Sequence, residues 1–317
     1  AADMAEMVKK ATRESFGETV TALAAEYPEI VVLDADLAAA TKTGIFKKAY
    51  PERFFDCGIA ECNMVGVAAG LATCGKIPFA ASFAMFSAGR AFEQVRNSVG
   101  YPKLNVKIVG SHAGISVGED GATHQCCEDI ALMRTIPGMV ILNPCDHYEM
   151  QAAVRAAVEH KGPCYIRLGR LAVESINNND DYKFELGKGI TLREGTDITV
   201  VATGLMVQEA VKAADALKEE GISVEVINIH TIKPLDEELV IASAKKTGRV
   251  ITVEEHNIIG GLGEAVSTAL SEHCPTPVTR IGVNDVYGHS GPAVDLLKEF
   301  GLSAEHIAEV IREKLAK

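Results

Sequence analysis

The chain has 317 residues, more than one ordinary domain contains and suited to two. Its net charge of −12 argues against a nucleic-acid ligand, and no apolar run approaches the roughly 18 residues of a membrane-spanning helix. Hydrophobic residues make up 47% and charged residues 23%, and no secretory signal is evident, so we expect a soluble cytoplasmic protein. Because the net charge is negative, we expect any anionic substrate to be bound by local arginines.

Short apolar, β-branched runs alternate with segments of helical periodicity from the start of the chain. In the first half, strands are expected at residues 30–33, 106–109 and 140–142, and helices at 62–74 and 148–160. This alternation is typical of a mainly parallel sheet covered by helices.

The alternation breaks at residues 173–195, where a run of Asn and Asp is followed by three glycines, and this stretch predicts a linker. Beyond it the pattern restarts, with strands expected at 198–201, 224–227 and 249–253 and a helix at 207–220. The predicted fold class is α/β, with two consecutive domains at 4–172 and 196–317. Each is expected to be a mainly parallel sheet covered by helices.

A glycine-rich turn at residues 260–263 opens a further predicted helix. Such a turn can hold a phosphate at the helix N-terminus, but this one lacks the GxGxxG spacing and the downstream acid of a dinucleotide site. We interpret it as tight packing of strand against helix.

The segment at residues 110–125 combines two histidines, two acids and four glycines after an apolar run. Glycine lets the backbone approach a ligand closely, and histidine beside aspartate can move protons or hold hydroxyls. We therefore expect His112, Asp120 and His124 at the rim of a polar active site. Cys126 and Cys127 follow, but no second ligand pair stands at metal-site spacing, so no metal site is expected within this chain.

Glu61 begins a largely apolar predicted helix, where the helix dipole stabilises a carboxylate. A simple helix-terminal charge is one interpretation. The apolar neighbours Ile59, Met64 and Val65 support another, a partly desolvated carboxylate that shares a proton with a bound heterocycle.

Phe83 and Phe86 stand at helical spacing among small residues. Clustered phenylalanines usually belong to a core, yet small neighbours leave room for a flat ring to stack on an aromatic face. Both interpretations are open from the sequence.

Arg167 and Arg170 lie at the end of an apolar strand. The two-residue period predicts that one of them points inward or across to a neighbouring face, unless the strand has already ended. Arg13 is a third cation that could converge on the same site. Each arginine is either a solvated charge or a fork for a phosphate group.

Taken in order, these motifs resemble the pyrimidine-binding and C-terminal domains of transketolase over essentially the whole chain. The matching segments are 11–13, 33–37, 58–61, Phe83 with Phe86, 118–125, Arg170, 231–236 and 253–256. Transketolases begin with a further domain whose Gly-Asp-Gly run and later Asn hold Mg²⁺ and the cofactor diphosphate. This sequence has no such run, so it resembles the C-terminal subunit of a split transketolase.

The resemblance implies thiamine diphosphate as cofactor and a role for each matching residue. Glu61 would drive cofactor activation, with His112 and His124 assisting proton transfer. The expected cofactor contacts are Asp36, Leu37, Glu61, Phe83 and Phe86. The expected substrate contacts are Arg13, His112, Asp120, His124 and Arg170. An alanine run at 38–40 stands where many relatives offer a serine or threonine, so one phosphate hydrogen bond is expected to be missing.

The implied activity is transfer of a two-carbon ketol unit from ketose phosphates to aldose phosphates, as in the pentose phosphate pathway. The implied partner is an N-terminal subunit that holds most of the Mg²⁺ (or Ca²⁺) site, in a heterotetramer with two copies of each chain. Alternatives are the β subunit of a 2-oxoacid dehydrogenase first component, an enzyme similar to deoxyxylulose-phosphate synthase, and a non-catalytic regulatory subunit.

Overall fold

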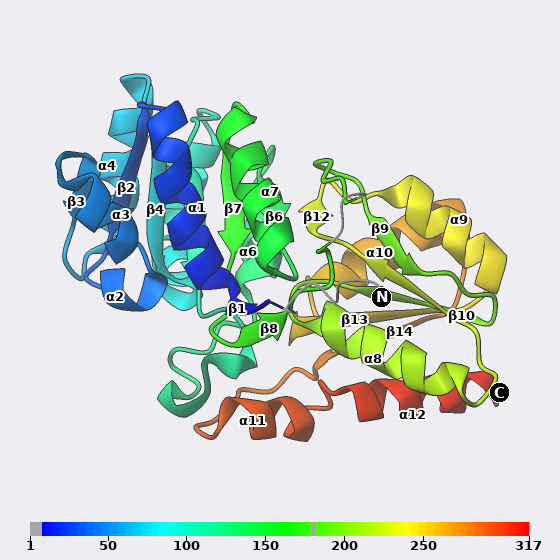
Figure 1. Cartoon of the computed structure of the whole chain (residues 1–317). Helices are drawn as coiled ribbons and strands as arrows, with labels where there is room; N and C mark the ends of the chain where they lie inside the picture. The colour runs from blue at the N-terminus through cyan, green and yellow to red at the C-terminus, as the bar shows by residue number, and fades with distance from the viewer. Residues whose placement is uncertain (1–7, 179–181, 317) are drawn as a thin grey trace, which may run out of the picture.

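The first lobe of the protein is built on a sheet with strand order β12-β6-β7-β5-β4-β2-β3 (Figure 1). The computed structural model describes residues 8–178 and 182–316. Every neighbouring pair in this sheet is parallel except β12 with β6. Its strands are β2 (Ile30–Asp34), β3 (Phe54–Asp56), β4 (Ile77–Phe83), β5 (Lys107–Ser111), β6 (Val140–Leu142), β7 (Cys164–Arg167) and β12 (Thr231–Lys233).

Helices cover both faces of this sheet because alternate strand residues bury apolar side chains on opposite faces. Ile30 and Val32 belong to a cluster with α1 and α7, whereas Val31 and Leu33 belong to a cluster with α4 that continues into the second lobe. The α-helices are α1 (Thr12–Glu26), α2 (Ala38–Thr41), α3 (Gly44–Ala49), α4 (Glu61–Thr73), α5 (Phe92–Gln94), α6 (Asp129–Arg134) and α7 (His147–Glu159). Two 3₁₀-helices span Pro51–Arg53 and Ile115–Asp120, and two π-helices span Met85–Arg90 and Val95–Gly100.

The second lobe has a five-stranded sheet with order β14-β13-β10-β11-β9, parallel except for β9. Its strands are β9 (Ile190–Arg193), β10 (Ile198–Ala202), β11 (Val224–Asn228), β13 (Val250–Asn257) and β14 (Val278–Val283). Its helices are α8 (Met206–Lys218), α9 (Glu237–Thr247), α10 (Leu262–His273), α11 (Ala293–Glu299) and α12 (Ala304–Leu315). The predicted fold class, two consecutive α/β units with mainly parallel sheets, is confirmed.

Two short strand pairs tie the halves of the chain together. β12 comes from the second half but joins the first sheet at β6, and β1 (Lys9–Ala11) pairs antiparallel with β8 (Ala172–Glu174). The stretch predicted as a linker, residues 173–195, therefore contains β9 and most of β8. Three- and four-residue strands are too short to show periodicity, which is why the sequence indicated only a linker.

Some predicted segments fall outside the described residues: 4–7 and 317 at the ends of the predicted domains, and 179–181 in the predicted linker. Within the described ranges, no helix has the length and apolar character that crossing a membrane requires.

Candidate active site

The carboxyl ends of β4, β5 and β7 lie next to one another at one edge of the first sheet. Phe83 ends β4 and pairs in register with Ser111, the last residue of β5. His112 follows immediately, and Arg170 lies three residues beyond the end of β7. Ligands of open α/β sheets bind at this edge, so three predicted site residues are placed where the fold offers a site.

Glu61 is the first residue of α4 and is only 2% exposed. Its side chain does not cap the helix; instead its Oε2 accepts a hydrogen bond from Arg90 Nη1 at 2.9 Å. Arg90 is half exposed, and its guanidinium lies 4.8 Å from the centre of the Phe86 ring. The geometry favours the second interpretation of Glu61, a desolvated carboxylate turned toward aromatic side chains rather than a charge that only ends a helix.

Arg90 was not singled out by sequence reasoning. It ends the π-helical segment Met85–Arg90, and the wider turn of that segment brings its side chain back over both Phe86 and Glu61. The available signal was a cation four residues after Phe86 in the same short segment. Its pairing with a carboxylate 29 residues away depends on the tertiary fold.

Four aromatic rings gather beside this ion pair. The ring of Phe83 stacks on His112 with centroids 4.0 Å apart and on Phe86 with centroids 6.1 Å apart. The ring of His124 presents its edge to both phenylalanines, 5.3 Å from Phe86 and 6.2 Å from Phe83. Phe83 is buried whereas Phe86 is half buried, so the pair lies between the core and the half-exposed Arg90, whose guanidinium covers the Phe86 ring.

His112 is held in a left-handed backbone conformation, with φ of 54°. Its Nδ1 lies 2.9 Å from the hydroxyl of Ser111. Burial, together with the nearby charges of Arg13, Arg170 and Lys42, lowers the pKa of His112 to about 3. The imidazole is therefore neutral near pH 7 and can both donate and accept a hydrogen bond.

The cations around His112 form a cluster of Arg13, Arg170 and Lys42. Arg13 Nη1 donates to the carbonyl of Ala40 at 2.8 Å, so the alanine run contributes a backbone oxygen that holds this arginine. Arg170 Nη1 donates to the carbonyl of Val117 and pairs with Glu119 at 2.6 Å. Lys42 was not predicted, because its position depends on a left-handed turn between α2 and α3.

Arg167 and Arg170 have different surroundings, and the two-residue period does not extend to Arg170 because β7 ends at Arg167. Arg167 points inward, where its Nε donates to Asp129 at 2.7 Å in a fully buried ion pair. It also donates to the carbonyl of Glu255 from the second lobe. Tyr165 donates to the same Asp129 carboxylate. Arg167 is thus part of the core between the lobes, and only Arg170 faces the candidate site.

Asp36, Leu37 and Asp120 lie apart from the aromatic cluster. Asp36 is exposed, and the backbone N–H of Leu37 donates to the buried Asp34 at 2.6 Å. The hydroxyls of Thr41 and Thr43 also donate to Asp34, whose pKa burial raises. Asp120 is exposed at the end of the 3₁₀-helix Ile115–Asp120, and no hydrogen bond of its side chain occurs within the described part of the chain.

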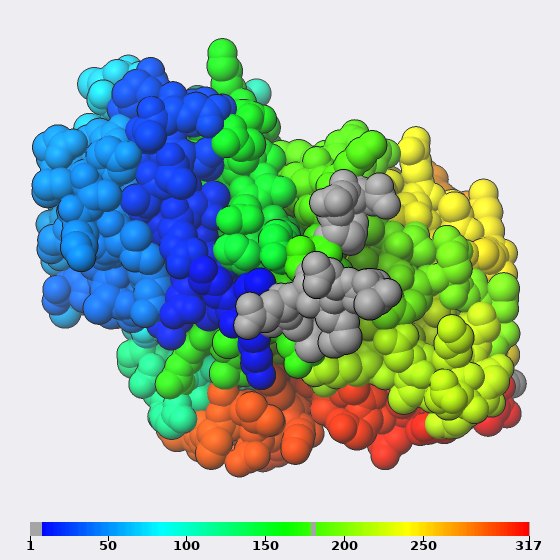
Figure 2. Space-filling view, in the orientation of Figure 1, coloured from blue at the N-terminus to red at the C-terminus, as the bar shows by residue number. Residues whose placement is uncertain are grey.

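The second lobe supports the loop that carries the predicted substrate contacts. The amide of Gln125 donates to the carbonyls of Ile115 and His289, and Glu255 accepts from the backbone N–H of Ser116 at 2.6 Å. Gly118 and Gly121 lie against residues 290–293, and Figure 2 shows this loop beside the segment that leads into α11. The position of the loop therefore depends on both lobes.

The glycine-rich turn before α10 is filled by a side chain of the protein itself. The carboxylate of Glu254 accepts from the backbone N–H groups of Leu262 and Gly263 at 2.7 and 2.8 Å. A Cβ at Gly261 would lie 2.0 Å from that carboxylate. The interpretation as tight strand-to-helix packing is confirmed, because the helix N-terminus already holds an anion.

No group of three or more His, Cys, Asp or Glu side chains that could hold a metal ion occurs among the residues that the structure describes. All eight cysteines are free thiols. Cys126 and Cys127 are buried, and burial raises the pKa of both thiols.

Comparison with known proteins assigns the family. The models for the transketolase pyrimidine binding domain and the transketolase C-terminal domain match residues 8–175 and 187–307. The chain is 52% identical to a putative transketolase C-terminal section from Methanocaldococcus jannaschii over 98% of both chains. It is 46% identical to a 6-deoxy-6-sulfo-D-fructose transketolase subunit from Clostridium sp. strain MSTE9, over 95% of this chain and 93% of that one.

A solved structure described as a split gene transketolase, inactive beta4 tetramer, is also similar. It superposes with a TM-score of 0.90 at 51% identity, covering 97% of this chain and 99% of that one. The chain therefore belongs to the transketolase family and resembles the C-terminal section of members whose gene is split.

Proposed function

We propose that this chain is the C-terminal subunit of a two-chain transketolase that moves a two-carbon ketol unit from a ketose phosphate to an aldose phosphate. The observation that carries the proposal is the buried carboxylate of Glu61, whose half-exposed partner Arg90 also covers the ring of Phe86. The similarity to transketolase subunits and C-terminal sections supports it. The proposal includes a cytoplasmic location and a role in pentose phosphate metabolism.

The residues present fit the aminopyrimidine half of thiamine diphosphate. Glu61 is a buried acceptor whose partner Arg90 is half exposed and can move aside. Phe83 and Phe86 offer faces on which a flat ring can stack. When bound, the cofactor supplies the electron sink needed to break and re-form a carbon–carbon bond. We assign Mg²⁺ and the diphosphate mainly to the partner subunit, with Asp36 and Leu37 at the edge that meets it.

The chain's own residues then bind and orient the sugar. Glu61 holds a proton against the ring nitrogen. The neutral imidazole of His112 hydrogen-bonds substrate hydroxyls and passes protons to them, and His124 assists it. Asp120, exposed on its loop, holds a further hydroxyl.

The cluster of Arg13, Arg170 and Lys42 binds the terminal anionic group of the sugar. Arginine forks suit the oxygens of a phosphate, and Arg170 would exchange its bond to Glu119 for the ligand. A sulfonate has similar oxygens and a lower charge. Whether the site prefers phosphate or sulfonate therefore depends on how much negative charge its cations neutralise.

Reconstitution tests the proposal. The isolated chain should be folded, self-associated and inactive, while addition of an N-terminal partner with a Gly-Asp-Gly…Asn motif, thiamine diphosphate and Mg²⁺ should restore ketol transfer. Two copies of each chain are the simplest closed arrangement with two complete sites. Native mass spectrometry measures that stoichiometry.

Two outcomes would contradict the proposal. One is full transketolase activity from this chain in a preparation that mass spectrometry shows to lack the partner. The other is a reconstituted complex that accepts short 2-oxoacids and ignores sugar phosphates, which would point to the dehydrogenase alternative.

A further inference from the structure

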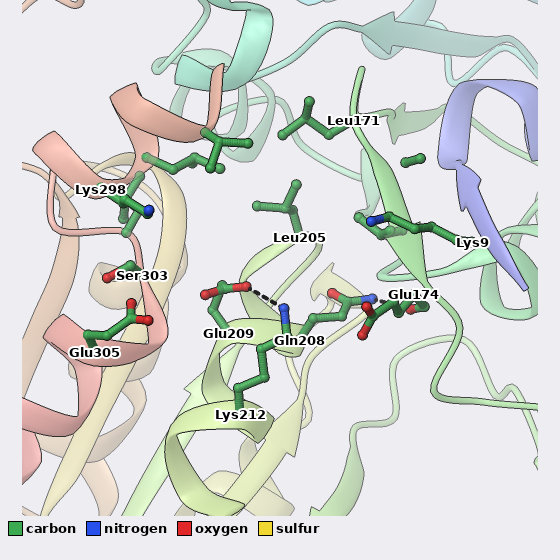
Figure 3. A pocket seen from close by; sticks show the side chains of 15 residues that line it. Lys9, Leu171, Glu174, Leu205, Gln208, Glu209, Lys212, Lys298, Ser303 and Glu305 are labelled. Carbon is green, nitrogen blue, oxygen red and sulfur yellow. Dashed lines mark hydrogen bonds and ion pairs between the residues drawn. The ribbon is translucent and has the colours of Figure 1, made fainter. Parts of the chain in front are cut away.

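A separate cavity of about 290 Å³ lies behind the candidate active site, between β8, α8, α11 and the turn before α12 (Figure 3). We call it the ladder cavity, because one of its walls is the two-stranded ladder of β1 and β8. Its volume is close to the lower end of the range for small-molecule sites. None of the predicted site residues lines it.

The ladder cavity has an apolar interior with one unsatisfied acceptor. Leu171, Leu205 and Leu297 contribute apolar surface from three different elements. Gln208 is only 5% exposed, and its Nε2 donates to the carbonyls of Cys145 and Glu174 at 2.6 and 3.0 Å. These two bonds fix the orientation of the amide, so its Oε1 is left buried without a partner. An unpaired buried acceptor costs stability, so a donor from a bound molecule would stabilise the amide of Gln208.

Charges of both signs surround the opening. Glu209 is already engaged, since it pairs with Lys212 at 3.0 Å and accepts from the backbone N–H of Ala304. Lys9 and Lys298 extend from opposite walls (Figure 3), and neither has an ion pair within the described residues. Glu305 faces the same space, near enough to Lys298 and Lys212 that they help to lower the pKa of its carboxylate.

We propose that the ladder cavity binds a small zwitterion with an apolar side chain, of the class of α-amino acids the size of leucine or phenylalanine. The ammonium donates to Oε1 of Gln208, the carboxylate pairs with Lys9 on the same side, and the side chain lies among Leu171, Leu205 and Leu297. A dianion such as a sugar phosphate is disfavoured because Glu174, Glu209 and Glu305 also line the cavity.

The walls of the ladder cavity connect directly to the cation cluster of the active site. Ala11 and Ala172 are register partners in the ladder; two residues beyond Ala11 is Arg13, and two residues before Ala172 is Arg170. α11, another wall, packs on the Ile115–Asp120 segment that holds Arg170. A ligand that fixes the ladder and α11 therefore restricts the motion of Arg13 and Arg170. This coupling to the active site rests on the proposed function, whereas binding of the ligand in the ladder cavity does not.

Calorimetric titration of the full chain with L-phenylalanine tests the binding. We expect one saturable site with a dissociation constant on the order of 1 mM. 3-Phenylpropanoate lacks the ammonium and phenethylamine lacks the carboxylate, so each should bind at least about tenfold more weakly. No saturable binding of L-phenylalanine or L-leucine up to about 20 mM, or equal binding of the three phenyl compounds, would overturn the proposal.

Two matched lysine variants locate the site. Lys9→Met should weaken L-phenylalanine binding by about tenfold, because one charge-assisted bond is lost. Lys298→Met on the opposite wall is the control and should change it less than about twofold. Both lysines are exposed, so neither change threatens the fold. Equal effects of the two variants would contradict the pose, and undiminished binding to Lys9→Met would overturn it.

A further variant and a kinetic readout complete the test. Val294→Trp, at an exposed rim position, should block the cavity and abolish binding; retained binding would place the ligand elsewhere. In the reconstituted enzyme, L-phenylalanine should change KM for a phosphorylated sugar at least about twofold with kcat unchanged. Binding without that shift would refute the coupling, independently of whether ketol transfer itself is restored.

Discussion

Two buried glutamates occupy comparable positions in the two lobes and have opposite surroundings. Glu61 stands at the start of α4 and is 2% exposed, and Glu254 faces the start of α10 and is 1% exposed. Glu254 accepts two backbone N–H groups at the helix N-terminus. The carboxylate of Glu61 has one hydrogen bond in the described part of the chain, from a side chain that is half in solvent.

The difference separates a structural carboxylate from one available for chemistry. Backbone donors cannot leave Glu254 without unwinding the helix, so the position of this carboxylate is fixed. Arg90 can leave Glu61 by rotating its own side chain. A ligand ring nitrogen can then take its place against the same carboxylate, with the Phe86 ring uncovered at the same moment.

The largest expected effect comes from removing the charge at Glu61. Glu61→Gln should lower kcat of the reconstituted enzyme by about 10² or more, because proton sharing with the cofactor ring is lost. The substitution is nearly isosteric and costs only the pairing with half-exposed Arg90, so the urea midpoint of the isolated chain should hardly move. Activity close to wild type would reject the proposed role of Glu61.

A third buried glutamate, Glu149 of α7, accepts hydrogen bonds but has no ion pair with a cation of the described residues. The backbone N–H of Cys145, the hydroxyl of Tyr182 and the amide of Asn228 all donate to it. Burial nevertheless raises its pKa to about 7. This carboxylate lies where the first lobe, the following segment and β11 meet, so its protonation is linked to the packing of the two lobes.

The sign of that linkage is testable. The folded chain keeps the proton of Glu149 where the unfolded chain releases it, so the resulting stability is full below about pH 4.5 and lost as pH rises to about 7. We expect the free energy of unfolding to fall by about 3 kcal/mol from this group. The lowered pKa of His112 makes stability rise with pH, which opposes the effect of Glu149. We therefore measure the free energy of unfolding by urea across this pH range for wild type and for Glu149→Gln, and take the difference as the contribution of Glu149. An unchanged pH profile in the variant would reject the assignment.

Arg170 tests the cation cluster around His112. Arg170→Ala should raise KM for a phosphorylated sugar by about 10- to 100-fold and leave an unphosphorylated acceptor nearly unaffected, because a charge-assisted bond is lost. Arg193 is an exposed arginine paired with Asp215, and Arg193→Ala is the matched control. It should leave KM unchanged for the phosphorylated sugar and for the unphosphorylated acceptor. Equal penalties on both acceptors would mean that Arg170 mainly positions the loop through Val117.

The sequence predicts the parts of the molecule whose signal is local. The alternation of strands and helices and the helix start at Glu61 follow from periodicity and local pattern. The pairing of β12 with the edge of the first sheet leaves no such pattern in the sequence, because a three-residue strand is too short to show a period.

The site residues that sequence reasoning missed depend on contacts across the fold. Arg90 reaches Glu61 only after β4 and α4 have packed, and Lys42 reaches His112 only through a left-handed turn. The glycine-rich turn at 260–263 shows the reverse case. Its occupant, Glu254, lies on the preceding strand, and a spacing of eight residues gives no sign that the carboxylate turns back to the helix.

Glu254 gives the smallest expected effect and completes the comparison. Glu254→Gln leaves one carbonyl oxygen for two backbone donors, so one N–H at the start of α10 loses its acceptor. We expect a loss of about 2 kcal/mol in the free energy of unfolding, the cost of one buried charge-assisted bond, measured by urea denaturation.

The reconstituted enzyme with Glu254→Gln should keep kcat within about twofold at a temperature where the variant is folded. Glu61→Gln should show the reverse pattern, with activity lost and stability kept. If Glu254→Gln instead lost activity without losing stability, the carboxylate before α10 would belong to a site and not to the helix.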